Sequence, residues 1–103
     1  MTTNSKNSSS KAPVYNEKDF FKDNGLKKCL NYYVREFKSH AKKEINTPDE
    51  LYNFFRRKNE CLDALYGVRM LLVFENRDSE TKNVDVAIQK IIDITEKATS
   101  SFN

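Results

Sequence analysis

The sequence predicts an all-α fold: a small antiparallel three-helix bundle with a long central helix, with or without a fourth, short N-terminal helix, and a disordered N-terminal arm. Two observations carry this prediction. Apolar residues recur every three or four positions through three consecutive segments, which is the period of a helix with one buried face. The single Asn-Gly dipeptide, Asn24-Gly25, has no alternating apolar run beside it, so it indicates a helix stop rather than a hairpin.

The first 14 residues lack any hydrophobic pattern. They hold four serines, two threonines, two asparagines, two lysines and no carboxylates. Such a segment buries too little apolar surface to offset the entropy lost on ordering. Residues 1–14 are therefore expected to be a disordered arm, and residues 15–103 the helical bundle domain.

Two helices are expected in the first half of the domain. A short one over residues 16–23 carries Phe20 and Phe21 and ends at Asn24-Gly25. A longer one is expected over residues 26–45, with its apolar residues on one face. These residues are Leu26, Cys29, Leu30, Tyr33, Phe37 and Ala41.

The central helix has the clearest start signal. Thr47 supplies a capping hydroxyl, Pro48 takes the first helical position, and Glu50 completes a capping box. No proline or polar cluster follows before residues 76–78, so this helix should span about 29 residues. Gly67, inside it, lets a neighbouring helix approach closely or lets the helix kink. The expected inward stripe consists of Leu51, Phe54, Phe55, Leu62, Leu65, Tyr66 and Val68.

The last helix is expected over residues 82–99, after a polar connection. Val86 is its one apolar residue outside the stripe. Three amphipathic helices joined by short polar links bury their stripes most simply as an up-down-up bundle. The expected stripe is Val84, Ala87, Ile88, Ile91, Ile94, Thr95 and Ala98.

Five consecutive apolar residues end the central helix. A helical run that is apolar all round must be covered on more than one side. Either the other helices, with Phe20 and Phe21, enclose it within one chain, or it forms a surface for self-association or for a partner. The run is Met70, Leu71, Leu72, Val73 and Phe74.

Two cations, Lys58 and Arg69, fall on the side of the central helix that is expected to face inward. They either bury their aliphatic stems and send the charge to water, or lie in an interface beside a carboxylate. Arg69 is therefore grouped with the apolar run as a candidate interface residue.

A line of cations follows the first long helix, opposite its apolar stripe. Lys28, Arg35, Lys38 and Lys42 are spaced by seven, three and four residues, and Lys43 adds to them. Such a line can follow a phosphate backbone, although it is also the ordinary pattern of a solvated helix face. The formal charge of +3 does not require an anionic partner.

The residue inventory argues against an enzyme. His40 is the single histidine, and no nucleophile and carboxylate are spaced around it in a known motif. Cys29 and Cys61 are expected to be reduced thiols that act as small apolar residues, as in a cytoplasmic protein. We expect no catalytic residue, cofactor, metal site or small-molecule substrate. No segment has the length and apolarity of a membrane span or a secretory signal.

These features favour a non-enzymatic protein-interaction or assembly subunit, which associates with itself or with a protein partner through the apolar end of the central helix. The alternative is a small nucleic-acid-binding accessory protein, of the kind a phage or plasmid encodes, acting through the basic line. An inhibitor or immunity-type protein would leave no motif and stays open.

Overall fold

A computed structural model describes residues 25–102 of the chain. Its elements are α2 (Gly25–His40), α3 (Pro48–Phe74), α4 (Asp78–Thr99) and the short 3₁₀ turn η2 (Ser100–Phe102). The arm expected over residues 1–14 and the short helix expected over residues 16–23 lie outside the described residues.

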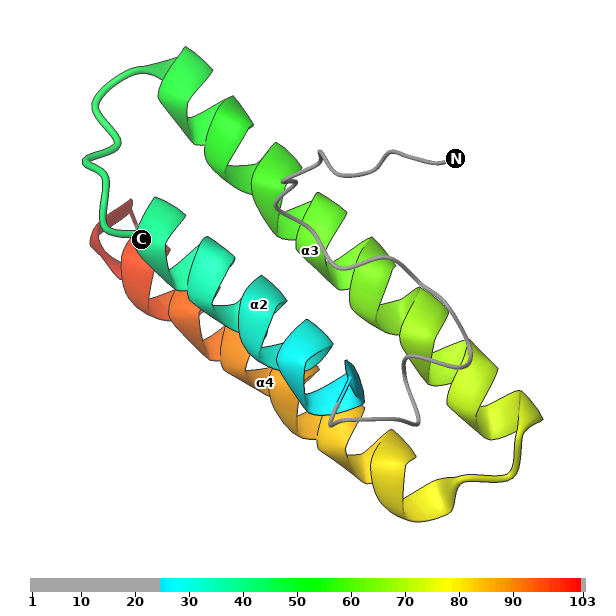
Figure 1. Cartoon of the computed structure of the whole chain (residues 1–103). Coiled ribbons are helices and arrows are strands. Elements are labelled where there is room, and N and C mark those ends of the chain that lie inside the picture. Colours follow the sequence, from blue (N-terminus) through cyan, green and yellow to red (C-terminus); the bar gives the residue numbers. More distant parts are fainter. Residues whose placement is uncertain (1–24, 103) are drawn as a thin grey trace, which may run out of the picture.

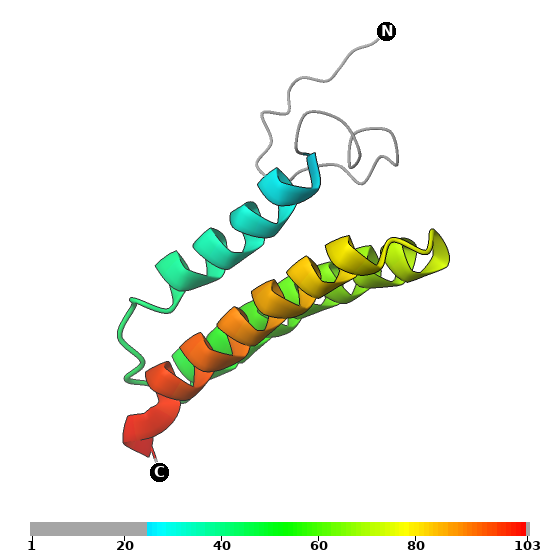
Figure 2. The same ribbon diagram turned by 90° about the horizontal axis from the view of Figure 1, so that it is seen from below.

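The three helices form an antiparallel bundle, as the sequence predicts (Figure 1). Each helix contacts the other two. Helices α3 and α4 run side by side along most of their length, joined by a tight turn, and α2 packs against the pair (Figure 2). The long central helix is also confirmed, since α3 spans 27 residues.

The ends of α3 are set by local hydrogen bonds. The Glu50 backbone N–H donates to the Thr47 hydroxyl over 3.1 Å, and the Thr47 backbone N–H donates to the Glu50 carboxylate over 3.1 Å, so the capping box is confirmed. At the other end Asn76 adopts a φ of 59°. Its N–H donates to the Val73 carbonyl and the Arg77 N–H to the Leu72 carbonyl, an arrangement that closes a helix through a left-handed residue.

Two helix boundaries differ from those expected. Helix α2 ends at His40 rather than near residue 45, because Lys42 and Lys43 donate to carbonyls three residues back and the helix tightens into a turn. Helix α4 begins at Asp78 rather than near residue 82. Carboxylates in its first turn favour a helix N-terminus, and Thr81, expected in the polar connection, is buried.

The core is a single apolar cluster between the three helices. Phe55 and Tyr66 were expected inward, and that expectation is wrong: their exposed fractions are 36% and 46%. Each directly follows a core residue, Phe54 or Leu65, and one step along a helix turns a side chain by about 100°. The buried apolar residues of α3 are Phe54, Cys61, Leu62, Leu65, Val68 and Leu72.

Candidate interaction surfaces

Helix α3 carries a second apolar stripe on the side turned away from the core. We call it the outer stripe. Tyr52 and Phe55 lie three residues apart near its start, and Tyr66, Met70 and Val73 follow at four- and three-residue steps near its end, so these side chains share one helix face. They are Tyr52, Phe55, Tyr66, Met70, Val73 and Phe74, all exposed.

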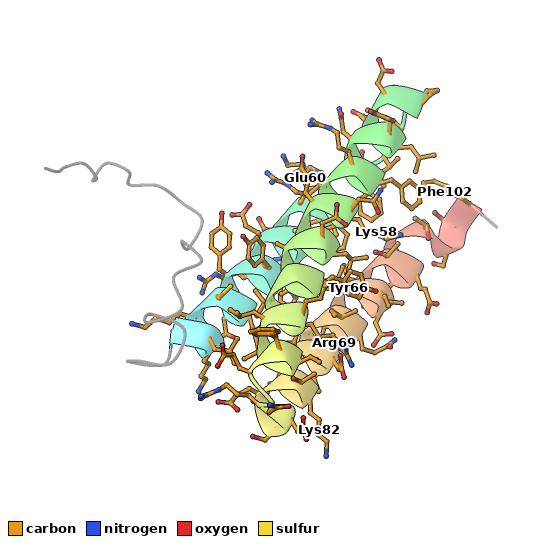
Figure 3. The ribbon with its side chains drawn as sticks, turned by 90° about the vertical axis from the view of Figure 1, so that its right-hand side faces the viewer. Lys58, Glu60, Tyr66, Arg69, Lys82 and Phe102 are labelled. Carbon is orange, nitrogen blue, oxygen red and sulfur yellow. The ribbon has the colours of Figure 1, made fainter. Side chains whose placement is uncertain are left out.

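The structure divides the five-residue run that ends α3. Leu72 is fully buried in the core, and Leu71 is half-buried against it. Met70, Val73 and Phe74 lie outside, with exposed fractions of 74%, 50% and 81%. The exposed surface therefore consists of these three residues together with Tyr66, which is exposed one turn before Met70. Figure 3 shows where Tyr66 lies on α3.

Arg69 joins α3 to α4 at the edge of the outer stripe. Its Nε donates to Asp85 Oδ1 over 2.6 Å and its second nitrogen to Oδ2 over 3.4 Å. Figure 3 shows Arg69 directed toward α4. The hydrogen bond from Arg69 holds the pKa of the Asp85 carboxyl below its usual value. The charge of Arg69 is therefore already paired within the chain.

Lys58, the other cation on this side of α3, lies over the Phe55 ring with its Nζ 5.5 Å from the ring centroid. A cation in this position is attracted to the face of the ring, and the Lys58 residue is half-buried. Lys58 and Arg69, which were expected on the inward face of α3, therefore both lie at the edge of the bundle and outside the core.

The basic line extends from α2 into the turn that follows it. Lys28, Arg35 and Lys38 are exposed on α2, whereas Lys42 and Lys43 belong to the turn that follows the helix. Arg35 and Lys38 instead line a groove between α2 and α4, which Lys42 and Lys43 do not.

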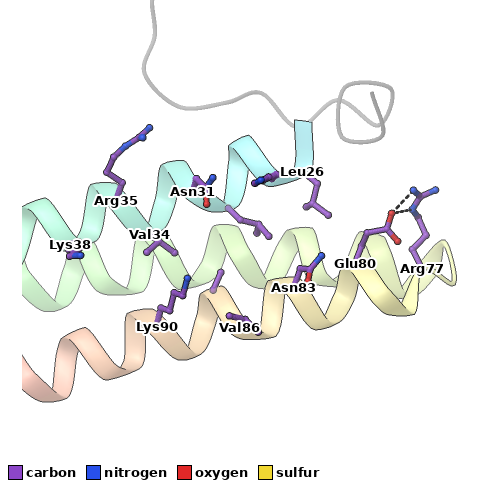
Figure 4. Close-up of a pocket in the computed structure, with 13 residues that line it drawn as sticks. Leu26, Asn31, Val34, Arg35, Lys38, Arg77, Glu80, Asn83, Val86 and Lys90 are labelled. Carbon is purple, nitrogen blue, oxygen red and sulfur yellow. Dashed lines mark hydrogen bonds and ion pairs between the residues drawn. The ribbon is translucent and has the colours of Figure 1, made fainter. Parts of the chain in front are cut away.

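We call this hollow the cationic groove (Figure 4). It has a volume of about 890 Å³, and all its lining residues come from α2, α4 and Arg77 beside the start of α4. Its cations are Lys27, Arg35, Lys38, Arg77 and Lys90, and its one carboxylate is Glu80.

The floor of the groove is apolar. Leu26 and Leu30 of α2 and Ala87 of α4 are almost fully buried beneath it, while Val86 of α4 is 55% exposed. Val34 of α2 also lines the groove and is half-buried (Figure 4). The groove therefore combines apolar side chains at its centre with cationic side chains along its edges.

Chemistry at the single histidine is limited by its surroundings. His40 stacks on Phe54, with ring centroids 6.5 Å apart. Burial lowers the pKa of His40, and the nearby charges of Lys43 and Arg57 lower it further. Among residues 25–102, no three histidine, cysteine, aspartate or glutamate side chains gather as a metal ion would need.

Cys29 and Cys61 form no disulfide with each other, and both are buried in the core. Burial raises the pKa of the Cys61 thiol to about 11, so the nucleophilic thiolate is scarce at neutral pH. Both residues act in the described structure as small apolar side chains.

No protein family matches this sequence, and comparisons with curated proteins and with solved structures find no similar protein. Within residues 25–102, none of the helices combines the length and apolarity that crossing a membrane requires.

Proposed function

We propose that this protein is a non-enzymatic helical assembly subunit, and that it pairs with a second copy of itself through the outer stripe of α3. The observation that carries the proposal is the cluster of Tyr66, Met70, Val73 and Phe74, which are exposed side by side at the end of the longest helix. Aromatic residues and methionine are enriched in the buried centres of protein interfaces.

The charges beside the stripe favour a second copy over a charged partner. Arg69 is paired with Asp85, and Arg56 is paired with Glu60 at 3.5 Å. Because these cations already have carboxylate partners within the chain, the rim of the stripe does not require opposite charges from outside. The cluster of Tyr66, Met70, Val73 and Phe74 holds no charged side chain, so it can pack against the same cluster of a second copy, as a two-fold symmetric dimer needs.

The spacing of the stripe also suits helix pairing. Tyr52, Asn59, Tyr66 and Val73 recur at intervals of seven residues along α3, and a seven-residue repeat keeps one seam facing a partner helix. A polar Asn within such a seam favours a single register at some cost in stability. Two α3 helices packed along this seam would form the centre of the dimer.

Sedimentation equilibrium of the full chain tests the proposal. We expect the mass to approach twice the chain mass of 12.1 kDa as concentration rises. Met70→Glu combined with Phe74→Glu should weaken dimerisation by about 10⁴-fold or more, because each side chain loses about 1.5–3 kcal/mol of apolar burial in each of the two copies. Circular dichroism should show unchanged helix content, since both side chains are exposed.

A matched control replaces two exposed apolar residues outside the stripe, Val86→Glu with Phe102→Glu. This variant introduces the same charge and should dimerise like the natural chain. A natural chain that is monomeric at every concentration would contradict the proposal. So would a control variant that loses dimerisation as completely as the stripe variant does.

The nucleic-acid alternative receives less support from the arrangement of the cations. Lys42 and Lys43 leave the line at the end of α2, and Arg35 and Lys38 lie beside an apolar-floored groove. A phosphate backbone would pair with these cations but would leave the apolar side chains between them uncovered. The residues of the cationic groove fit a different ligand better than they fit a nucleic acid.

A further inference from the structure

The cationic groove lies on other helices than the outer stripe, so it is open for a second function. It extends from Leu26 to Lys38 along α2, a distance of about 18 Å at the ~1.5 Å rise per helical residue. This length matches about three turns of a helix. The groove lies between α2 and α4, which run in the same direction (Figure 4). A groove between two neighbouring helices is a place where one more helix packs in a bundle or in helix-in-groove recognition.

The charges of the groove define the chemistry of such a helix. Lys27, Arg35, Lys38 and Lys90 make no ion pair with any carboxylate among residues 25–102. At the far end Glu80 accepts from Arg77 over 2.6 Å, so the excess positive charge lies along the rest of the groove. Carboxylates of a ligand would meet cations from both helices there.

The apolar floor distinguishes between two kinds of anionic ligand. A nucleic acid would satisfy the cations with phosphates but would leave Val34 and Val86 without apolar contact. A helix with apolar residues on one face and carboxylates beside them would cover both valines and reach the cations at the same time. Half of the Val86 surface is exposed at this point, and burial of such surface favours binding.

We propose that the cationic groove binds an acidic amphipathic helix of a protein partner, three to four turns long. Val34 and Val86 contact its apolar face, and Arg35, Lys38 and Lys90 contact its carboxylates. This inference is independent of the proposed dimer, because all residues that line the groove belong to α2, α4 and Arg77. Together the two surfaces would make the protein an adaptor that brings two partner helices into one assembly.

The test measures fluorescence anisotropy of a labelled synthetic peptide of about 14 residues. The peptide contains Leu, Glu and Ala, with Leu at the first, fourth, eighth and eleventh positions and Glu at the positions flanking that stripe. The comparison ligands are a scrambled peptide of the same composition and labelled single- and double-stranded DNA of about 20 nucleotides. We expect the full chain to bind the amphipathic peptide at least tenfold more tightly than the scrambled one.

Two variants separate the charges of the groove from charge in general. Arg35→Glu with Lys90→Glu should weaken peptide binding at least tenfold, because both side chains line the groove. Lys28→Glu with Lys42→Glu makes the same charge change outside the groove and should weaken it less than threefold. Val34→Ala with Val86→Ala should weaken binding of the amphipathic peptide and leave binding of the scrambled peptide unchanged.

Three results would overturn the proposal. One is no binding of the amphipathic peptide, and another is equal loss in the groove variant and its charge-matched control. The third is tighter binding of DNA than of the peptide together with insensitivity to Val34→Ala and Val86→Ala, which would assign the cations to a phosphate backbone instead.

Discussion

His40 shows how the surroundings of one residue connect to stability. Burial beside Phe54 and the charges of Lys43 and Arg57 hold its pKa in the folded protein below the ordinary value of 6.5. The unfolded chain therefore takes up this proton first as the pH falls. The stability that neutral His40 contributes is fully present above about pH 6.5 and is lost as the pH falls through that value toward the folded pKa.

We predict that His40→Gln reduces the pH dependence of stability in this window. Between pH 7.5 and 5.5 the natural chain should lose more free energy of unfolding than the variant, since Gln does not titrate. Urea unfolding at several pH values, followed by circular dichroism, measures the difference. Carboxylates titrate in both proteins and cancel in the comparison. Parallel stability curves for the two proteins would contradict the prediction.

At the scale of one element, α3 tolerates a glycine in its interior. A Cβ placed on Gly67 would meet nothing within 4 Å, so close approach of a neighbouring helix does not explain this residue. Glycine costs a helix roughly 1 kcal/mol relative to alanine because it loses more backbone entropy on folding. The position therefore lowers the stability of α3 without any compensating contact among the described residues.

We predict that Gly67→Ala raises the free energy of unfolding by up to about 1 kcal/mol. Thermal or urea unfolding, at a concentration where the protein is monomeric, measures this change in the free energy of unfolding. Asn59→Ala is a suitable comparison, because it also creates an exposed alanine in α3 without removing a glycine. A loss of stability in Gly67→Ala relative to the natural chain would contradict the prediction.

For the whole molecule, the outer stripe and the cationic groove lie on different helices, and this separation has a measurable consequence. Met70→Glu with Phe74→Glu should abolish dimerisation and leave the affinity for the acidic peptide within about twofold, because distant sites act additively. Arg35→Glu with Lys90→Glu should weaken peptide binding and leave dimerisation unchanged. Sedimentation and anisotropy on the same two proteins check both statements, and joint loss of both activities in either variant would refute the separation.

The start, end and length of the central helix could be predicted because their causes are local. Thr47 and Glu50 exchange hydrogen bonds three residues apart, and the polar residues after Phe74 close the helix with Asn76 in a left-handed conformation. The start of α4 was missed, although Asp78 and Glu80 in its first turn favour a helix N-terminus, because a polar Thr81 also fits a connection and only packing shows that it is buried.

By itself the sequence determined the helical class, the three long helices and the exposed position of Val86, because periodicity and capping act within one turn or two. Only the tertiary structure decided which apolar residues of α3 face inward. Apolar side chains lie on both sides of that helix, so spacing could not tell Phe54 from Phe55. It also decided that Arg35 and Lys90 share one groove, because residues distant in the chain meet only when α2 and α4 pack together.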